Sequence, residues 1–205
     1  MTIAIIILTV LVSLQAFRDP LIKGKLLFIP YFIKREKSYF RFLGHGLIHK
    51  DYNHLLLNML VLFFFGYRGV EDYYQLFHGE LGNIAFLGLY VSALIMSSLP
   101  TYFMKQNDRS YAALGASGAV SAIVFAFIFI NPWADLYLMF IPIGIPGIVF
   151  GILYIGYSVY MSKQANDNIG HEAHLFGAIW GILYTLMLMP ELWYNFIHQI
   201  QNPAW

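Results

Sequence analysis

The chain contains no cysteine and few charged side chains, and both absences limit what it can be. Without cysteine, its 205 residues form no disulfide and offer no thiolate nucleophile or metal ligand. Charged residues make up 11% of the chain, whereas a soluble domain carries about 25%, so they cannot cover a water-exposed surface. The hydrophobic content of 59% instead favours a protein embedded in a lipid bilayer. The net charge of +1 gives no reason to expect nucleic acid as a partner.

Charged residues separate six apolar stretches, and we interpret each stretch as a membrane-spanning helix. A bilayer core needs about 20 helical residues, and the shorter stretches suit a locally thinned membrane. The predicted spans cover residues 2–17, 52–67, 82–103, 117–131, 137–161 and 173–190. No repeat or linker interrupts this series, so we expect one domain over residues 1–205. The first stretch lacks the basic start of a signal peptide, and we expect it to be retained.

Two segments outside the predicted spans are expected to have unusual positions. Residues 18–50 mix apolar clusters with many of the 12 Lys and Arg residues, which favours a structure lying in the membrane interface. Residues 110–116 are free of charge, and we expect them to be non-helical, with a helix that starts near Ser117. Irregular backbone at that depth must be buried in protein or line a watery cavity.

Proline and tryptophan mark the last third of the chain. Pro142 and Pro146 are expected to loosen the first half of the fifth predicted span. Trp193 and Trp205 are expected to anchor the C-terminal tail at the interface.

Six spans would place several polar side chains at one depth of the membrane. The second, fourth and sixth spans run in the same direction, so their N-terminal ends share one leaflet. His49 and His54 lie at the start of span two, Ser117 at the start of span four, and His174 at the start of span six. We therefore expect these polar groups to lie close together.

The polar residues at this depth match the parts that a serine hydrolase needs, namely a nucleophile, a base and hydrogen-bond donors for an oxyanion. Ser117 lies between Gly115 and Gly118, which allow other backbone or a substrate to approach closely. The Ser117 N–H is also unpaired if a helix starts there. His174 is the candidate base.

Small residues favour close packing of the fourth and sixth spans. Gly177 and Gly181 are four residues apart and form a smooth stripe on one face of a helix. Gly118 and Ala122 supply a matching stripe. Packing these stripes together would bring His174 near the candidate nucleophile.

Span two offers further hydrogen-bond donors. His54 and Asn58 are four residues apart and project from one face of a helix, which suits an oxyanion hole. A polar pair that joins neighbouring helices is the alternative interpretation. His49 is placed to support His54 from the preceding connection.

A metal site is a weaker interpretation of the histidines. By number alone, a metal could bind among His45, His49, His54, His171 and His174. The sequence has few carboxylates near these residues, and His171 and His174 are spaced i, i+3 rather than the i, i+4 of a HExxH zinc motif. We therefore predict no metal and no cofactor, and keep a metal or proton transporter as an alternative function.

The motifs together resemble the rhomboid family of intramembrane serine proteases. The matches are G-x-S-G at residues 115–118, H-x4-H-x3-N at residues 49–58, and H-x2-G-x3-G at residues 174–181, in the family's order on six predicted spans. The resemblance implies an all-α bundle of six transmembrane helices with a membrane-embedded first loop. It also implies single-span membrane proteins as substrates, cut in or near the span where the helix unwinds easily.

The resemblance implies a role for each matching residue. Ser117 would be the nucleophile and His174 the base of a dyad without an acidic third member. His54, Asn58 and the Ser117 N–H would form the oxyanion hole. The supporting residues would be His49, Gly115, Gly118, Gly177 and Gly181. Residues 163–172 would cap the site, and span five would be the lateral gate.

Three features depart from the family's usual pattern. Many members carry Tyr four residues after the serine, stacked on the base, where this chain has Ser121; an aromatic from span four or five would have to replace it. Phe40, before Arg41, stands where a Trp is usual. The missing Tyr leaves a catalytically inactive relative that binds client helices as an alternative function.

The third departure concerns orientation. The resemblance implies a bacterial inner-membrane protein with its N-terminus in the cytoplasm and its site toward the outer face. On that layout, only Arg68 of the 12 Lys and Arg residues lies on the cytoplasmic side, against the positive-inside rule. The rule is weakest for a long loop folded into the interface, so we retain the family's orientation.

Overall fold

The computed structural model describes residues 1–137, 143–164 and 170–203. Pro142, Trp205 and residues 165–169 of the predicted cap lie outside the described residues. The described chain is mostly helical.

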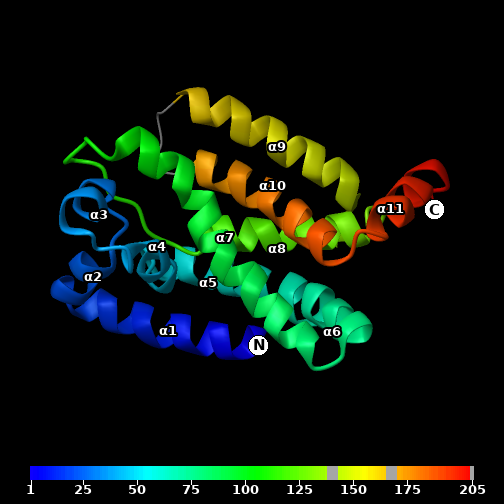
Figure 1. Ribbon diagram of the computed structural model, residues 1–205, viewed down its shortest axis with the longest axis horizontal. Helices are drawn as coiled ribbons and strands as arrows, with labels where there is room; N and C mark the ends of the chain where they lie inside the picture. Colours follow the sequence, from blue (N-terminus) through cyan, green and yellow to red (C-terminus); the bar gives the residue numbers. More distant parts are fainter. Residues whose placement is uncertain (138–142, 165–169, 204–205) are drawn as a thin grey trace.

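Six helices alternate in direction along the chain (Figure 1). One set consists of α1 (Thr2–Arg18), α7 (Leu81–Lys105) and α9 (Gly147–Gln164). The opposite set consists of α5 (Tyr52–Val61), α8 (Ser117–Ile130) and α10 (His171–Leu188). The helices of the second set all start in the left half of the molecule in Figure 1, as expected for the second, fourth and sixth predicted spans.

The helical run that starts with α5 continues well beyond the predicted end of span two at residue 67. It passes into a π-helical segment, η2 (Leu62–Glu71), and then into α6 (Asp72–His78). The predicted polar connection after residue 67 is thus helical up to His78. The apolar pattern did not reveal this because Glu71, although charged, is only 2% exposed and bonded inside the protein.

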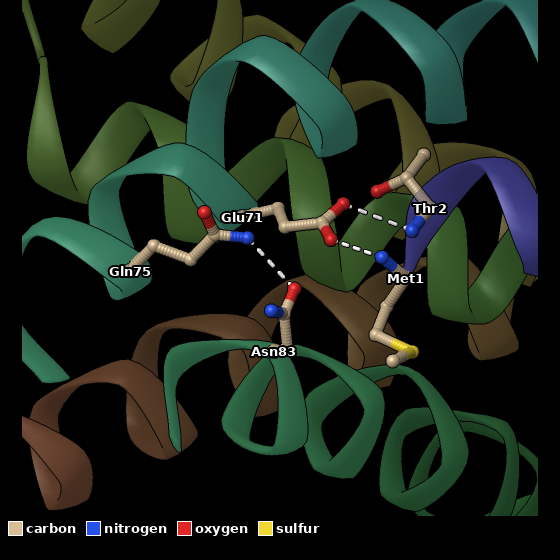
Figure 2. Close-up of polar contacts among 5 residues, drawn as sticks. All are labelled: Met1, Thr2, Glu71, Gln75 and Asn83. Atoms are coloured by element: carbon tan, nitrogen blue, oxygen red, sulfur yellow. Dashed lines mark hydrogen bonds and ion pairs between the residues drawn. The ribbon is translucent and has the colours of Figure 1, made fainter. Parts of the chain in front are cut away.

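Glu71 joins this helix to the start of α1 (Figure 2). Its carboxylate pairs with the Met1 ammonium group and accepts a hydrogen bond from the Thr2 N–H at 2.9 Å. A carboxylate is favourable there because the free N–H groups of a helix N-terminus carry partial positive charge. One turn further on, Gln75 Nε2 donates to Asn83 Oδ1 at 2.7 Å and joins α6 to α7 (Figure 2). Buried and partly buried polar contacts therefore hold this part of the molecule together.

The connection between α1 and α5 is structured. It contains α2 (Pro20–Leu26), α3 (Pro30–Glu36), α4 (Arg41–Gly44) and a 3-10 turn, η1 (His45–Leu47). Arg41 is buried, and its Nη1 donates to the carbonyls of Gly24 and Leu27 at 3.0 and 2.7 Å. Phe28 exchanges two backbone hydrogen bonds with Ala113, which ties the connection to the segment before α8.

The fifth helix begins ten residues later than the predicted span 137–161. A short antiparallel hairpin precedes it, with β1 (Asp135–Tyr137) paired to β2 (Gly144–Pro146). Proline has no N–H to donate, and it drives the preceding residue toward an extended conformation. Ile145 therefore lies in a strand, and the helix starts only after Pro146.

By length and composition, α7 alone among the described helices is long and apolar enough to cross a membrane. Helix α10 and the following helix, α11 (Leu192–Gln201), pass the same test together but are bent by 116°. Helices α1 and α8 are apolar and shorter. Trp193 lies on α11 and is half exposed.

Candidate active site

Helix α8 begins at Ser117, as the sequence predicts, because the backbone before it cannot be helical. Gly115 has φ of +114°, a conformation that side-chain-bearing residues rarely adopt. A β-carbon at this position would also lie 2.7 Å from Cε1 of His54. Gly115 is thus required both by its own backbone and by the imidazole packed on it. The chain turns here and presents Ser117 as the first residue of the helix.

The backbone before Ser117 is held by two buried histidines of the first connection. His45 Nδ1 lies 3.2 Å from the Gly115 carbonyl, and the Gly115 N–H donates to the His45 carbonyl at 2.9 Å. The Ala116 N–H donates to His49 Nε2 at 3.4 Å. Two consecutive peptide groups next to the serine are therefore fixed from outside α8.

These contacts also define the protonation of His49. Its Nε2 accepts from a backbone N–H, so a neutral ring carries its proton on Nδ1. That nitrogen lies 3.0 Å from Ser13 Oγ, which in turn donates to the Leu47 carbonyl at 2.8 Å. Ser13 of α1 thus forms a chain of hydrogen bonds that orients the His49 ring.

Burial keeps both histidines neutral. It lowers the pKa of His45 to about 4, and the fully buried Nε2 of that ring has no hydrogen-bond partner among the described residues. Burial, with the nearby His54 and His45, lowers the pKa of His49 to about 3. A proton added to Nε2 of His45 would lack a hydrogen-bond acceptor. A proton added to Nε2 of His49 would break the hydrogen bond from the Ala116 N–H.

We expect acidification to destabilise the protein through these two rings. The ordinary histidine pKa is 6.5, so below that pH the unfolded chain takes up protons that the folded chain does not bind until about pH 4 to 3. The free energy of unfolding should fall by up to about 1.4 kcal/mol per pH unit for each histidine as the pH drops from 6.5 toward 4.

The measurement is the apparent unfolding midpoint in detergent at pH 7, 6 and 5. His49→Gln keeps an acceptor and a donor in place and should reduce the pH dependence by up to about 1.4 kcal/mol per pH unit. The matched control is His198→Gln, at an exposed position on α11, which should leave the dependence unchanged. Equal slopes for wild type and His49→Gln would contradict this account.

Ser117 and His174 line the same cavity, which has a volume of about 200 Å³. Its walls are mainly apolar, and polar atoms come from few residues. Helix α8 supplies Ser117 and Ser121, α9 supplies Tyr154, and α10 supplies His174. Among the described residues that line it there is no Asp or Glu. A hydroxyl and an imidazole from separate helices thus face one small, largely apolar space.

Contact between the backbones of α8 and α10 places these side chains together. A β-carbon on Gly177 would collide with the Gly118 carbonyl oxygen, and one on Gly181 would collide with that of Ala122. The predicted packing of the two small-residue stripes is confirmed. Gly118 is equally confined, because its β-carbon would lie 2.7 Å from Ser97 Cβ of α7.

His54 and Asn58 have different surroundings in the structure. The His54 ring packs on Gly115 and lies 5.0 Å, centre to centre, from the ring of His49. Asn58 is buried, and its Nδ2 donates to the His54 carbonyl at 2.8 Å. Neither residue lines the cavity that contains Ser117. His54 therefore packs on a residue two positions before Ser117, whereas Asn58 is bonded within α5.

Comparison with protein families matches residues 36–191 to the Rhomboid domain. The chain belongs to the rhomboid family. This family is membrane-embedded and includes serine proteases, and the match covers the end of the first connection, α5, α8 and α10.

Individual rhomboid relatives are similar over different shares of their length. RHOMBOID-like protein 12, mitochondrial, of Arabidopsis thaliana is 35% identical over 138 residues, which are 63% of this chain and 40% of that protein. Rhomboid protease GlpG of Haemophilus influenzae is 25% identical over 182 residues, 88% of this chain and 85% of the relative. Putative rhomboid protease YdcA of Bacillus subtilis is 28% identical over 154 residues, which are 75% of this chain and 69% of that protein. The chain thus spans less than half of the Arabidopsis relative.

Sequence reasoning missed several residues that surround this candidate site. Ser13 looked like an ordinary serine in an apolar helix, and His45 was considered only as a metal ligand. An aromatic from span four or five was expected beside His174, and Tyr154 of α9 lies there, but no local motif singles it out. Among the described residues, no three His, Cys, Asp or Glu side chains converge as a metal site would require.

Proposed function

We propose that this rhomboid is an intramembrane serine endopeptidase that uses Ser117 and His174 as a catalytic dyad. The observation that carries the proposal is the shared cavity: Ser117 at the first position of α8 and His174 on α10 face one space, and the backbones of these helices touch. Family membership supports the reaction class.

The proposed reaction follows from the chemistry of these two side chains. His174 takes the proton of the Ser117 hydroxyl as Oγ attacks the carbonyl carbon of the substrate peptide bond. The resulting oxyanion accepts a hydrogen bond from the Ser117 N–H, which has no helical partner at the start of α8. The C–N bond then breaks, and His174 returns the proton to the leaving amine. Water, deprotonated by the same imidazole, hydrolyses the acyl-enzyme and restores the serine.

We propose that the six alternating helices are the six membrane spans. Their alternating directions support this layout, and the folding of residues 18–50 into short helices supports an embedded first loop. The substrates are single-span membrane proteins that enter past α9, and the cut falls where the substrate helix unwinds. The protein lies in a bacterial inner membrane with Ser117 toward the outer face.

The test uses purified protein in detergent, a fluorophosphonate probe and a model single-span substrate. We expect cleavage of the substrate and covalent labelling that maps by mass spectrometry to the peptide containing Ser117. A protein that only binds client helices would give neither signal. Labelling at another serine, or no cleavage, would overturn the proposal.

His54 and Asn58 are proposed as further oxyanion donors, and their placements predict unequal effects. His54→Ala is expected to lower kcat about 10²-fold with little change in KM, since the donor acts on charge that develops in the transition state. Asn58→Ala should cost less, because its amide already donates to the backbone of α5. Asn53→Ala, exposed on the same helix, is the matched control and should match wild type. The assignment fails if His54→Ala raises KM and leaves kcat unchanged.

A further inference from the structure

A hydrogen bond inside the cavity joins α8 to α9. The hydroxyl groups of Ser121 and Tyr154 lie 2.6 Å apart. Ser121 is 5% exposed and lies one helical turn after Ser117, on the same face of α8. The tyrosine reaches this bond from α9, a helix that contributes many exposed side chains elsewhere. The bond therefore fixes the far end of the Tyr154 ring at a defined point beside the dyad.

The same ring lies against His174. The two ring centres are 6.2 Å apart and the ring planes are inclined by 32°. Phe125 of α8 and Phe150 of α9 contact other parts of the Tyr154 ring, with centres 5.5 and 5.8 Å away. Tyr154 is thus held by two aromatic neighbours and one hydrogen bond, with its ring beside the imidazole.

The size of residue 121 makes this arrangement possible. Ser121 and Tyr154 both line the cavity of about 200 Å³, so a large side chain at position 121 would compete with the tyrosine for that space. A serine leaves the space free and supplies the hydroxyl that holds the ring. The two residues are complementary in volume and in hydrogen bonding.

We propose that Tyr154 is a positioning residue for His174, held in place by Ser121, so that the orientation of the base depends on the position of α9. The inference rests on the proposed function, since His174 must be the base. The ring restricts the imidazole to the rotamer that faces Ser117, and the hydrogen bond restricts the ring. Displacement of α9 would break the bond and release the imidazole.

The first test is Tyr154→Leu, assayed for cleavage of the model substrate. We expect kcat to fall about tenfold with little change in KM, because one aromatic contact is worth about a factor of ten at most when its only task is to hold a catalytic group. Tyr160→Leu, at an exposed position six residues further along α9, is the matched control and should retain wild-type kcat. A change in KM alone would overturn the positioning role and indicate a substrate contact.

The second test is a double-mutant cycle. Ser121→Ala and Tyr154→Phe each delete one partner of the same hydrogen bond, so each should lower kcat by about threefold, and the double variant should be no slower than either single variant. Multiplicative effects would show that the residues act independently and would contradict the inference. The unfolding midpoint is measured for every variant. A lower kcat with an unchanged midpoint shows that His174 is mispositioned in a folded protein.

The third test is rescue, and it also separates this inference from the proposed function. Ser121→Tyr combined with Tyr154→Leu places an aromatic ring beside His174 from α8, and it should recover more than half of wild-type kcat. If wild type cleaves, Ser117→Ala does not, and Tyr154→Leu equals wild type, the inference fails and the dyad stands. If wild type does not cleave, the proposed function itself fails.

Discussion

Ser117→Ala and His174→Ala are each expected to lower the rate of substrate cleavage by about 10⁴-fold or more, and the double variant is expected to be no slower than either one. The reason is that nucleophile and base act as a unit. Without the base, the serine hydroxyl is a weak nucleophile at neutral pH; without the serine, the imidazole has nothing to deprotonate for attack. Any residual rate would come from oxyanion donors and substrate binding.

The measurement is single-turnover cleavage of the model substrate by purified protein, with thermal unfolding of each variant recorded alongside. Ser110→Ala and His198→Ala serve as matched controls, since both positions are exposed and neither lines the cavity. They should cleave at the wild-type rate. Cleavage by Ser117→Ala within tenfold of wild type would refute the dyad, and additive losses in the double variant would assign the two residues to separate steps.

The start of α8 and its contact with α10 were predictable because short-range chemistry determines both. Glycines at positions 115 and 118 allow backbone turns and close contacts that other residues resist, and glycines four residues apart define one helix face. These signals are local in sequence. They therefore predicted that the helix would start at Ser117 and that Gly177 and Gly181 would pack on it.

Other parts of the structure depend on contacts that sequence spacing does not encode. Helix α6 passes through a polar stretch because Glu71 is bonded to the start of α1, more than 60 residues away in the chain. The contact between Tyr154 and His174 requires a ring from α9 to reach across the cavity. Ser13 gains its role only because α1 lies beside His49. None of these residues belongs to a motif, so only three-dimensional placement identifies them.

The largest structural effect is expected at Gly181, where Gly181→Val should lower the apparent unfolding midpoint by more than about 6 °C and reduce cleavage at least about 100-fold. The new β-carbon would overlap the carbonyl oxygen of Ala122, which belongs to a buried helix backbone and cannot rotate away as a side chain would. Relief requires α10 to separate from α8. Because His174 is carried by α10 and Ser117 by α8, that separation also moves the proposed base away from the proposed nucleophile.

The matched control is Gly156→Val on α9, since a β-carbon there would meet nothing within 4 Å. Both variants make the same chemical change in the middle of a helix, so intrinsic helix propensity and side-chain entropy cancel in the comparison. Gly177→Ala extends the series, because its β-carbon would press on the carbonyl of Gly118, the residue after Ser117. This variant should lower kcat strongly and the unfolding midpoint only slightly. If Gly181→Val unfolds and cleaves like Gly156→Val, the backbone contact between α8 and α10 does not support the site, and the proximity of Ser117 and His174 must have another cause.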